Sequence, residues 1–383
     1  MLLSVIIVNF NAKSFLEQCL HSLRKAVSLS PALAGHTEVF IVDNASDDGS
    51  LPFIEPLYPE FRFIRNTENK GFAKANNQAL SACSGEFILF LNPDTILPED
   101  TLDTVVRFFG DHPDAGAAGL RMVDGSGRFL KESKRGFPDP RAAFFRIFGL
   151  ARLFPRSRFF SAYYAGHLDP DQDQAVDILS GAFMMVRKSA IDRTGGFDER
   201  FFMYGEDIDL SWRIRQAGFQ NYYLASARIV HFKGESTPQD ARYVKQFHQA
   251  MSRFIEKHGK GSGTGTQYLL KFGINGKRVV ERVLLPFKRK SGRPGIQSLF
   301  IKGRPADLNE IGDKLQKAGY IIRTKVKEAD AILFCESPGL TLKDIVEELD
   351  SSPEPVVCFI HGEGTRGAVG SPSGKEKGMI ISL

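Results

Sequence analysis

Apolar runs of strand length alternate with segments of helical periodicity along the first part of the chain. Leu2–Asn9 is a continuous run rich in β-branched residues, which is typical of a strand covered on both faces. Ser14–Ala26 then carries apolar residues at helical spacing, and further strands are predicted at Thr37–Asp43, Phe61–Arg65 and Glu86–Leu91. Strands that alternate with helices in this way predict a parallel sheet joined by right-handed crossovers.

The same pattern continues to about residue 260. Helices are predicted at Gly71–Cys83, Pro98–Phe109, Ile208–Ala217 and Asp240–His258, and strands at Ala115–Val123, Val176–Arg187 and Tyr222–His231. The glycine-rich stretch Gly259–Thr266 then interrupts the periodicity and predicts a flexible break. We therefore predict a first domain that comprises residues 1–260.

A second and smaller α/β pattern follows a basic stretch. Ten basic residues and one acid, Glu281, lie between Lys271 and Arg304, so residues 261–295 are predicted to be a basic, partly amphipathic linker. Strands at Gln297–Ile301, Ala331–Cys335 and Val356–His361, with helices at Ala306–Lys317 and Leu342–Leu349, predict a small C-terminal α/β domain of residues 296–383. It has no GxGxxG after its first strand, which leaves a partner-binding or dimerisation module and a degenerate nucleotide-binding half as alternatives.

Composition narrows the class of protein. The chain has 383 residues, of which 42% are hydrophobic and 25% charged, as expected of a globular protein. Its net charge of +5 is too small to indicate a nucleic-acid-binding protein. The four cysteines form no CxxC pair, which favours free thiols in a reducing cytoplasm.

The sequence contains no segment that predicts a membrane span. No stretch reaches the roughly 18 consecutive apolar residues that a spanning helix needs. The N-terminal segment is apolar, but it has neither a basic leader nor a small-residue cleavage site, so we predict a buried strand and not a signal peptide. We expect a cytoplasmic protein.

Polar residues end three of the predicted strands. They are Asn9, Asp43, and Asn92 together with Asp94. Ligands of open α/β sheets bind at the carboxyl ends of the strands, so we expect these residues to border a binding site. A carboxylate at position 94 can reach a hard metal ion that is bound to phosphates, although Asn92-Pro93-Asp94 is also an ordinary strand-end turn.

Two polar loops extend this candidate site. The turn Asp43–Ser50 offers carboxylates to a base N–H or a ribose hydroxyl, although clusters of this composition are usually plain turns. The segment Asn69–Asn77 opens a helix whose N-terminal N–H groups face phosphate or sugar, unless it is simply a capped helix. The candidate nucleotide-binding residues are Asn9, Asp43, Asn44, Lys70, Gly71, Asn76 and Asn92.

Three acids crowd the start of a predicted helix. Glu206, Asp207 and Asp209 follow Gly205, and acids at a helix N-terminus are favourable for stability alone. Glu206 and Asp207 are adjacent and point in different directions, so one can structure the turn while the other faces a cleft. His231 follows a strand, and it becomes a strong candidate for a metal ligand only if Asp94 holds a metal ion.

Seven motifs, taken in order, resemble one known family. They are SVIIVNFN, VDNASDDGS, NKGFAKANN, GEFILFLNPDT, SGAFMMVRKSAI, GGFDERFFMYGEDIDLSWRIRQAGF and VHFKGES. This set resembles an inverting family 2 glycosyltransferase of GT-A fold, close to the rhamnosyltransferase-like branch, and it covers Leu2 to His258. The resemblance implies a Rossmann-like mixed sheet over residues 1–260, which would form the catalytic domain.

The resemblance also implies roles for single residues. Asp43 would bind the nucleobase of a nucleoside diphosphate sugar. Asp94 and His231 would hold Mg²⁺ or Mn²⁺, and Asp207 would be the general base of a single displacement. Glu206 or Asp209 would support the loop and the acceptor, with Trp212 on the same helix serving packing and orientation. The family's acidic motif usually begins with Asp, and Asn92 at that position removes one negative charge from the metal site.

Two basic segments suggest contact with a membrane. Arg135–Tyr164 packs nine aromatic residues among six arginines, which suits either a bilayer interface or a buried helical insertion beside the acceptor. Residues 271–304 are either attracted to anionic lipid head groups or form a solvated linker. We expect a glycan or lipid-linked acceptor and a peripheral position at the inner face of the cell membrane.

Two alternative functions compete with this hypothesis, namely a nucleotidyltransferase and a non-catalytic nucleotide-sugar-binding protein. A nucleotidyltransferase would have a glycine-rich loop with a basic residue after its first strand, and a sensor would have no use for Asp207. The donor sugar, rhamnose or another hexose, stays open at this stage, as does a homodimer. No nucleic-acid partner is expected.

Overall fold

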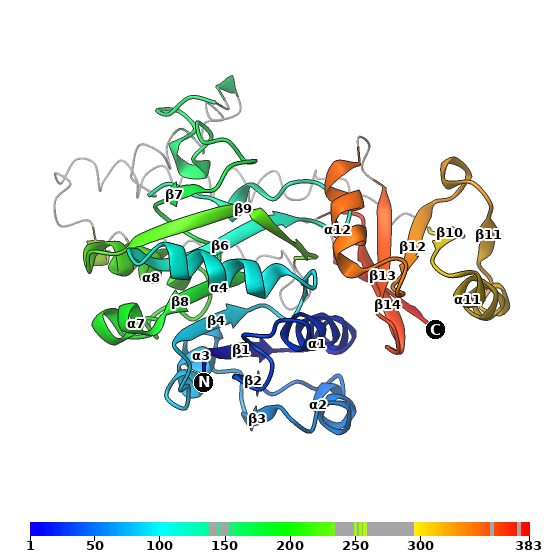
Figure 1. Ribbon diagram of the computed structural model, residues 1–383, viewed down its shortest axis with the longest axis horizontal. Helices are drawn as coiled ribbons and strands as arrows, with labels where there is room; N and C mark the ends of the chain where they lie inside the picture. The colour runs from blue at the N-terminus through cyan, green and yellow to red at the C-terminus, as the bar shows by residue number, and fades with distance from the viewer. Residues whose placement is uncertain are drawn as a thin grey trace.

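The computed structural model describes residues 1–137, 145, 153–154, 156–233, 249–250, 253–254, 256–258, 295–352, 356–373 and 377–383. These residues form two β-sheets that lie side by side, each with its own helices (Figure 1). Within these ranges, no helix is both long enough and apolar enough to cross a membrane. Residues 261–294 of the predicted linker 261–295 and most of the predicted helix Asp240–His258 fall outside them.

The first sheet has nine strands and is mixed. Its order is β3 (Arg62–Arg65), β2 (Thr37–Asp43), β1 (Leu3–Asn9), β4 (Phe87–Leu91), β8 (Phe183–Arg187), β6 (Ala115–Val123), β9 (Gln220–His231) and β5 (Thr95–Ile96), and β7 (Gln174–Val176) pairs with β9. Strands β1 to β4 are parallel, but β8 runs antiparallel to both β4 and β6. Strands β6 and β9 are also parallel to each other, so the all-parallel prediction is wrong for the whole sheet, whereas the mixed sheet that the resemblance implies is confirmed.

Helices cover both faces of this sheet. The helices α1 (Lys13–Ser28) and α4 (Thr101–Asp111) pack on one face, and α3 (Phe72–Leu80), α7 (Lys188–Thr194) and α8 (Glu206–Gln216) pack on the other. Successive residues of a strand point to opposite faces, so Val5 and Ile7 enter one core while Ile6 and Val8 enter the other. This double burial explains why the first apolar run is continuous and not alternating.

Shorter elements complete the first part of the molecule. They are α2 (Ser50–Ile54) and the 3₁₀ turns Glu55–Leu57, Lys131–Ser133 and Ala162–Tyr164. The single strand predicted over Val176–Arg187 is wrong, because β7 and β8 belong to different places in the sheet and residues 177–182 connect them as a loop. This loop borders the cavity that is described below.

The parallel strands bring their polar ends to one edge. Asn9 and Asp43 are direct partners in the register of β1 and β2, and Asn92 follows β4, which pairs with β1 on its other side. Strand β9 ends at His231, which is paired with Thr95 of β5, directly after Asp94. The topology thus gathers residues from distant parts of the sequence.

The C-terminal residues form a second, six-stranded sheet. Its order is β11 (Ile321–Arg323), β10 (Ser298–Lys302), β12 (Ala331–Cys335), β13 (Val357–His361), β14 (Gly367–Ser371) and β15 (Met379–Ser382). Helices α11 (Pro305–Lys317) and α12 (Leu342–Ser351) and a 3₁₀ turn at Val326–Glu328 complete it. The strands β10 to β13 are parallel, whereas β14 and β15 were not predicted and are antiparallel.

The two sheets share a hydrophobic core. Phe15, Ile96 and Phe232 of the first part pack in one cluster with Phe334 and Ile345 of the second. Ion pairs and hydrogen bonds surround this cluster, and α1 lies against β14 (Figure 1). The C-terminal sheet is therefore docked on the first one through buried apolar contacts.

Glu336, directly after β12, is the central polar contact of this interface. Its buried carboxylate accepts hydrogen bonds from His21 at 2.5 Å and from Lys25 at 2.6 Å, both on α1. Burial alone would raise the pKa of Glu336, but these two donors outweigh it and lower the pKa to about 2. Helix α1 thus occupies the carboxyl edge of the second sheet, where an open α/β sheet usually binds its ligand.

Candidate active site

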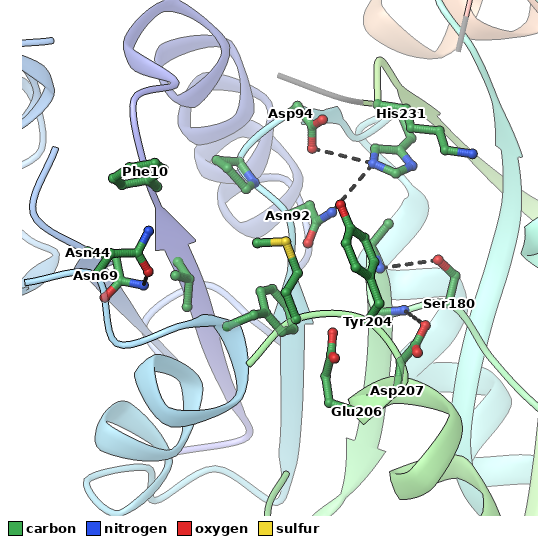
Figure 2. A pocket seen from close by; sticks show the side chains of 17 residues that line it. Phe10, Asn44, Asn69, Asn92, Asp94, Ser180, Tyr204, Glu206, Asp207 and His231 are labelled. Atoms are coloured by element: carbon green, nitrogen blue, oxygen red, sulfur yellow. Dashed lines mark hydrogen bonds and ion pairs between the residues drawn. The ribbon is translucent and has the colours of Figure 1, made fainter. Parts of the chain in front are cut away.

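A cavity of about 230 Å³ opens at the carboxyl edge of the first sheet (Figure 2). Its walls come from the loops after β1, β2 and β4, the loop between β7 and β8, the start of α8 and the end of β9. Six predicted site residues line it, namely Asn44, Asn92, Asp94, Glu206, Asp207 and His231. The remaining predicted site residues lie outside its walls.

Asp94 and His231 form a pair on one wall of the cavity (Figure 2). An Asp94 carboxylate oxygen lies 3.4 Å from His231 Nε2, and the Asn92 amide nitrogen lies 3.4 Å from the same ring atom. Both side chains of the pair are buried apart from this wall. The pair is fixed from behind, because the Phe232 N–H donates to the Asp94 carbonyl oxygen at 3.0 Å.

This donor set fits a divalent cation that is shared with a ligand. A carboxylate, an imidazole and the amide oxygen of Asn92 are suitable donors for Mg²⁺ or Mn²⁺. Within the part of the chain that the structure describes, no group of three or more His, Cys, Asp or Glu residues could hold a metal ion alone. The chain therefore suits a cation that takes its other ligands from phosphates and water, as Mg²⁺ commonly does.

The start of α8 presents Glu206 and Asp207 to the opposite wall (Figure 2). The chain enters this helix through Tyr204 at a φ of 69° and Gly205 at a φ of 93°. A left-handed conformation is uncommon for a tyrosine, and such backbone strain clusters at functional sites. The two residues turn the chain so that the first acids of α8 face the cavity.

Glu206 is buried and protonated at neutral pH. Its Oε2 atom has no hydrogen-bond partner among the residues described, although the side chain is only 6% exposed. Burial raises the pKa of Glu206 to about 8, and the negative charge of Asp207 contributes to the rise. A neutral carboxyl in this position can donate a hydrogen bond to a ligand.

Asp207 is held in place by three donors. Its Oδ1 atom accepts a hydrogen bond from the Ile208 N–H at 2.8 Å, and its Oδ2 atom accepts from Arg135 at 2.5 Å and from the Gly181 N–H at 3.2 Å. The ion pair with Arg135 is largely buried, with side chains 14% and 11% exposed. A guanidinium is always charged, so Arg135 both orients the carboxylate and balances its charge.

Arg135 was not predicted as a site residue. It precedes Asp207 by 72 positions, and its own neighbourhood in the sequence contains no motif that ties it to an acid. The cavity also contains Phe10, Ser180 and Tyr204, which were not named as candidates, and Asn69, which was named only as the start of the segment Asn69–Asn77. Contacts of this kind depend on the path of the chain and are not visible in local patterns.

Asp43 lies beside a second hollow, which the turn after β2 forms together with Glu55 and Arg65. Its carboxylate accepts hydrogen bonds from the Asn9 amide at 2.8 Å and from the Ser46 N–H at 3.0 Å. Asn9 is fully buried and holds this turn through its hydrogen bond from the protein interior. Because Asn44 lines the first cavity and Asp43 the second, adjacent residues connect the two hollows.

Asn44 fixes the loop that precedes α3. Its side-chain oxygen accepts a hydrogen bond from the Lys70 N–H at 3.1 Å, and its amide donates to Asn69 at 3.0 Å. Lys70 therefore contributes its backbone to this loop. Asn76 lies one turn into α3, where it is buried and donates to the Phe72 carbonyl oxygen, away from the cavity.

Gly71 marks a close approach of two loops. It has a φ of +81°, and a Cβ atom there would lie 2.6 Å from the carbonyl oxygen of Phe202. The same carbonyl accepts a hydrogen bond from the Phe72 N–H at 2.8 Å. The loop before α3 is thereby attached to the loop that leads into Glu206.

Asp209 and Trp212 point away from the cavity. Asp209 is fully buried and bonds to Arg213, Lys257 and His258, each at 2.7 Å. Burial would raise the pKa of Asp209, but the hydrogen bonds from Lys257 and His258 and the charge of Arg213 lower it overall. Trp212 packs on Phe137 with ring centroids 4.2 Å apart. Both residues stabilise α8 from behind.

The sheet, the acids at the start of α8 and the Asp94–His231 pair define a glycosyltransferase of the GT-A type. The chain belongs to glycosyltransferase family 2, because the family described as "Glycosyl transferase family 2" matches residues 4–195, half of the chain. The resemblance inferred from the seven motifs is thus confirmed. The departure at Asn92 does not prevent the match.

Curated relatives agree with this assignment. The N-acetylglucosaminyl-diphospho-decaprenol L-rhamnosyltransferase of Mycobacterium tuberculosis is 32% identical over 256 residues, which are 63% of this chain and 81% of the relative. The rhamnosyltransferase WbbL of Escherichia coli is 28% identical over 238 residues, 60% of this chain and 82% of the relative. The protein is therefore a glycosyltransferase.

Two solved structures were also compared with the chain. The mannosyltransferase PcManGT of Pyrobaculum calidifontis, in complex with GDP-Man and Mn²⁺, gives a TM-score of 0.47 at 19% identity, and the match covers 82% of this chain and 80% of that one. S. aureus TarS 1-349 in complex with UDP-GlcNAc gives a TM-score of 0.48 at 19% identity, with 76% and 77% covered.

Proposed function

We propose that this enzyme transfers a sugar from a nucleoside diphosphate sugar to a hydroxyl group of a glycan or lipid-linked acceptor, with inversion at the anomeric carbon. The names of two relatives support rhamnose as the donor sugar, and one of these names specifies an N-acetylglucosaminyl-diphospho-lipid. Such an acceptor would bring the enzyme to the inner face of the cell membrane, where cell-envelope polysaccharide is made.

One observation carries this proposal. The Asp207 carboxylate and the Asp94–His231 pair open onto the same cavity from opposite walls. A sugar between them would have its reacting carbon near a base on one side and its diphosphate near cation ligands on the other. Asp43, at the adjoining hollow, is in a suitable place for a nucleobase.

The chemistry follows from this arrangement. Asp207 would accept the proton of the acceptor hydroxyl while that oxygen attacks the anomeric carbon. The new bond between carbon and acceptor oxygen forms as the bond to the diphosphate oxygen breaks, and the electron pair leaves with the nucleoside diphosphate. Attack opposite the leaving group inverts the configuration. A divalent cation held by Asp94 and His231 would supply charge stabilisation for the diphosphate.

The protein contributes further interactions to this step. Arg135 orients Asp207, and the protonated Glu206 would donate a hydrogen bond to a sugar oxygen in the cavity. The Lys70 and Phe72 N–H groups of the loop before α3 are engaged by Asn44 and by the Phe202 carbonyl oxygen, so this loop would shape the cavity wall around the donor. None of these roles requires Asp209 or Trp212 to touch a substrate.

A donor panel with one variant tests the proposal. Wild-type enzyme should transfer or hydrolyse one nucleoside diphosphate sugar, and Asp207→Asn should lower kcat by at least about 100-fold, the scale of lost general-base catalysis. The donor Kd should stay nearly unchanged, because the amide keeps the shape of the carboxylate. Near-normal kcat in the variant would exclude Asp207 as the base.

A further inference from the structure

A basic hollow lies on the far side of Arg135 from the donor cavity. It has a volume of about 390 Å³, and its charged lining residues are Arg135, Arg158, Asp177 and Arg215, with His167 at its edge. Arg135 links the two sites, because it lines this hollow and its guanidinium binds Asp207, which lines the donor cavity. A molecule bound in the hollow would thus be separated from the proposed base by the Arg135 side chain.

The charges of the hollow leave an uncompensated cation. Arg135 is paired with Asp207, and Arg215 is paired with Asp177. For Arg158, no ion pair or hydrogen bond of its guanidinium is found within the described ranges. Its side chain is exposed and free to meet an anion.

Lys134 adds a second positive charge behind the hollow. Its ammonium group is buried and donates to the carbonyl oxygens of Ala165 and Leu168, at 3.0 and 2.9 Å. Both of these residues line the hollow, so the charge lies directly beneath its wall. The pKa of His167 is lowered by burial and then by the charges of Arg158 and Lys134, which agrees with a positive potential there.

Exposed aromatic side chains adjoin this positive charge. Phe159, directly after Arg158, is 56% exposed, and Phe154 is 51% exposed. They belong to one aromatic cluster, since Phe160 packs against both with ring centroids 5.3 and 5.0 Å apart. A cation beside exposed aromatic rings suits a ligand with an anionic head and an apolar tail.

We propose that this hollow binds the diphosphate group of a lipid-linked sugar acceptor, with Arg158 as its main contact and Phe154 and Phe159 beside the lipid. The proposal rests on the proposed glycosyl transfer and specifies its acceptor. With the diphosphate in the hollow, the attached sugar would have to extend past Arg135 to present its hydroxyl group to Asp207. The acceptor is thereby recognised by its charge as well as by its sugar.

Two acceptors that carry the same sugar provide the test. One has a diphosphate between the sugar and a short lipid, and the other is a neutral alkyl glycoside. Wild-type enzyme should show a KM about tenfold lower for the diphosphate acceptor, the scale of one charged hydrogen bond. Arg158→Glu should raise that KM at least about tenfold and leave the KM values of the donor and of the neutral glycoside unchanged.

Control variants isolate the site. Arg158→Lys should retain most of the preference, and Lys325→Glu, an equal charge change on an exposed residue of the connection between β11 and β12, should have no effect. The proposal is overturned if Arg158→Glu leaves the KM of the diphosphate acceptor unchanged, or raises both acceptor KM values equally. Hydrolysis of the donor without any acceptor reports on the proposed function separately.

Two binding measurements cover the remaining outcomes. Calorimetry with inorganic pyrophosphate in EDTA should detect binding to the wild type and its loss in Arg158→Glu. Equal binding in both proteins, or no binding in either, would contradict the proposal. This measurement decides the question even if the enzyme uses neither acceptor. Sedimentation with phosphatidylglycerol vesicles identifies a membrane contact. If Arg158→Glu weakens vesicle binding alone, the hollow binds lipid head groups and the assignment to the acceptor is wrong.

Discussion

Two neighbouring acids at the start of α8 experience different surroundings. Asp207 is held by a guanidinium and two backbone N–H groups, whereas Glu206 leaves one oxygen without a partner within the described residues. Environments that separate the proton affinities of two carboxyl groups commonly mark a division of roles in catalysis. The structure therefore supports a protonated Glu206 beside an Asp207 side chain that is bound to Arg135 in the same cavity.

Glu206→Gln should stabilise the protein at neutral and alkaline pH. The pKa of Glu206 rises from its ordinary value of 4.5 to about 8 on folding, so native stability is lost as the pH increases between these values. The amide does not ionise and should recover on the order of 3 kcal/mol of unfolding free energy at pH 8. Thermal melting of both proteins from pH 5 to 9 measures this gain.

The pH dependence is the decisive part of that experiment. The difference in Tm between variant and wild type should grow from pH 5 to about 8 and then level off. A difference that is independent of pH would mean that Glu206 is ionised throughout, in conflict with its burial.

Asn92→Asp should strengthen cation binding. The additional carboxylate would lie next to the Asp94–His231 pair and restore the charge that the family's acidic motif usually has. One more negative charge at such short range should lower the Kd for Mn²⁺ about tenfold. Electron paramagnetic resonance titration of free Mn²⁺ measures the Kd without any turnover. An unchanged Kd would place the cation elsewhere, and Asp94→Asn should shift it in the opposite direction.

Sequence motifs predicted the acids and the histidine of the cavity, but not the residues that hold them. Asp94, Asp207 and His231 were recognisable because each belongs to a family motif. Arg135 and Tyr204 were not, since an ion pair across 72 positions and a strained φ leave no local signature. Asn76 and Asp209 were grouped with the site from their position in the sequence, although their helices turn them into the protein interior.

At the scale of single elements, the loops before α3 and α8 act as one unit. The Phe72 N–H and the carbonyl oxygen of Phe202 join them, and Gly71 permits the close approach. Because one loop is also bound to Asn44 and the other leads to Glu206, a shift in either would change the shape of the cavity.

Gly71→Ala should therefore weaken both stability and donor binding. The new Cβ would meet the Phe202 carbonyl oxygen at 2.6 Å, in addition to the strain of a φ of +81°. We expect a loss of about 2 kcal/mol in unfolding free energy and a higher donor KM. Gly35→Ala is a matched control, because Gly35 has a φ of +74° and no atom within 4 Å of a new Cβ. Equal losses of stability in the two variants would show that the contact between the loops is unimportant.

Periodicity located most elements but not their pairing. Continuous apolar runs identified β1, β2, β4 and β12, because strands buried on both faces are apolar throughout. The direction of β8 could not be predicted, since periodicity does not record the orientation of a strand. The edge strands β11 and β15 were missed because they are short and partly exposed.

At the scale of the whole molecule, the C-terminal sheet supports the donor cavity from behind. Phe232, next to His231, is buried in the cluster that the two sheets share, and its N–H holds the carbonyl of Asp94. One interpretation of this sheet was a degenerate nucleotide-binding half. The edge where such a sheet binds its ligand is covered by α1, which contacts Glu336 there. The carboxyl edge of the C-terminal sheet therefore serves to bind α1 of the first sheet.

Glu336→Gln should loosen this docking in a pH-dependent way. The pKa of Glu336 falls from 4.5 to about 2 on folding, so its ion pairs stabilise the native state above pH 4.5 and lose this effect as the pH falls towards 2. At pH 7 the variant should lose on the order of 3 kcal/mol of unfolding free energy. Urea unfolding at pH 7 and at pH 3.5 measures the loss, which should be smaller at the lower pH.

A surface pair at the 3₁₀ turn between β11 and β12 controls for general effects of replacing a carboxylate by an amide. Glu328→Gln removes an exposed pair with Lys325 and should change stability by less than about 0.5 kcal/mol at either pH. If Glu336→Gln behaves in the same way, the buried contact with α1 does not contribute to docking.

The shared core has a practical consequence for anyone who dissects this protein. An expression fragment that stops at residue 260 would retain Phe15, Ile96 and Phe232, which are at most 3% exposed in the intact chain, but not the side chains that cover them. Water would reach a contiguous apolar surface behind the Asp94–His231 pair. Such a fragment should self-associate, and detergent or a co-expressed C-terminal piece would be the remedy.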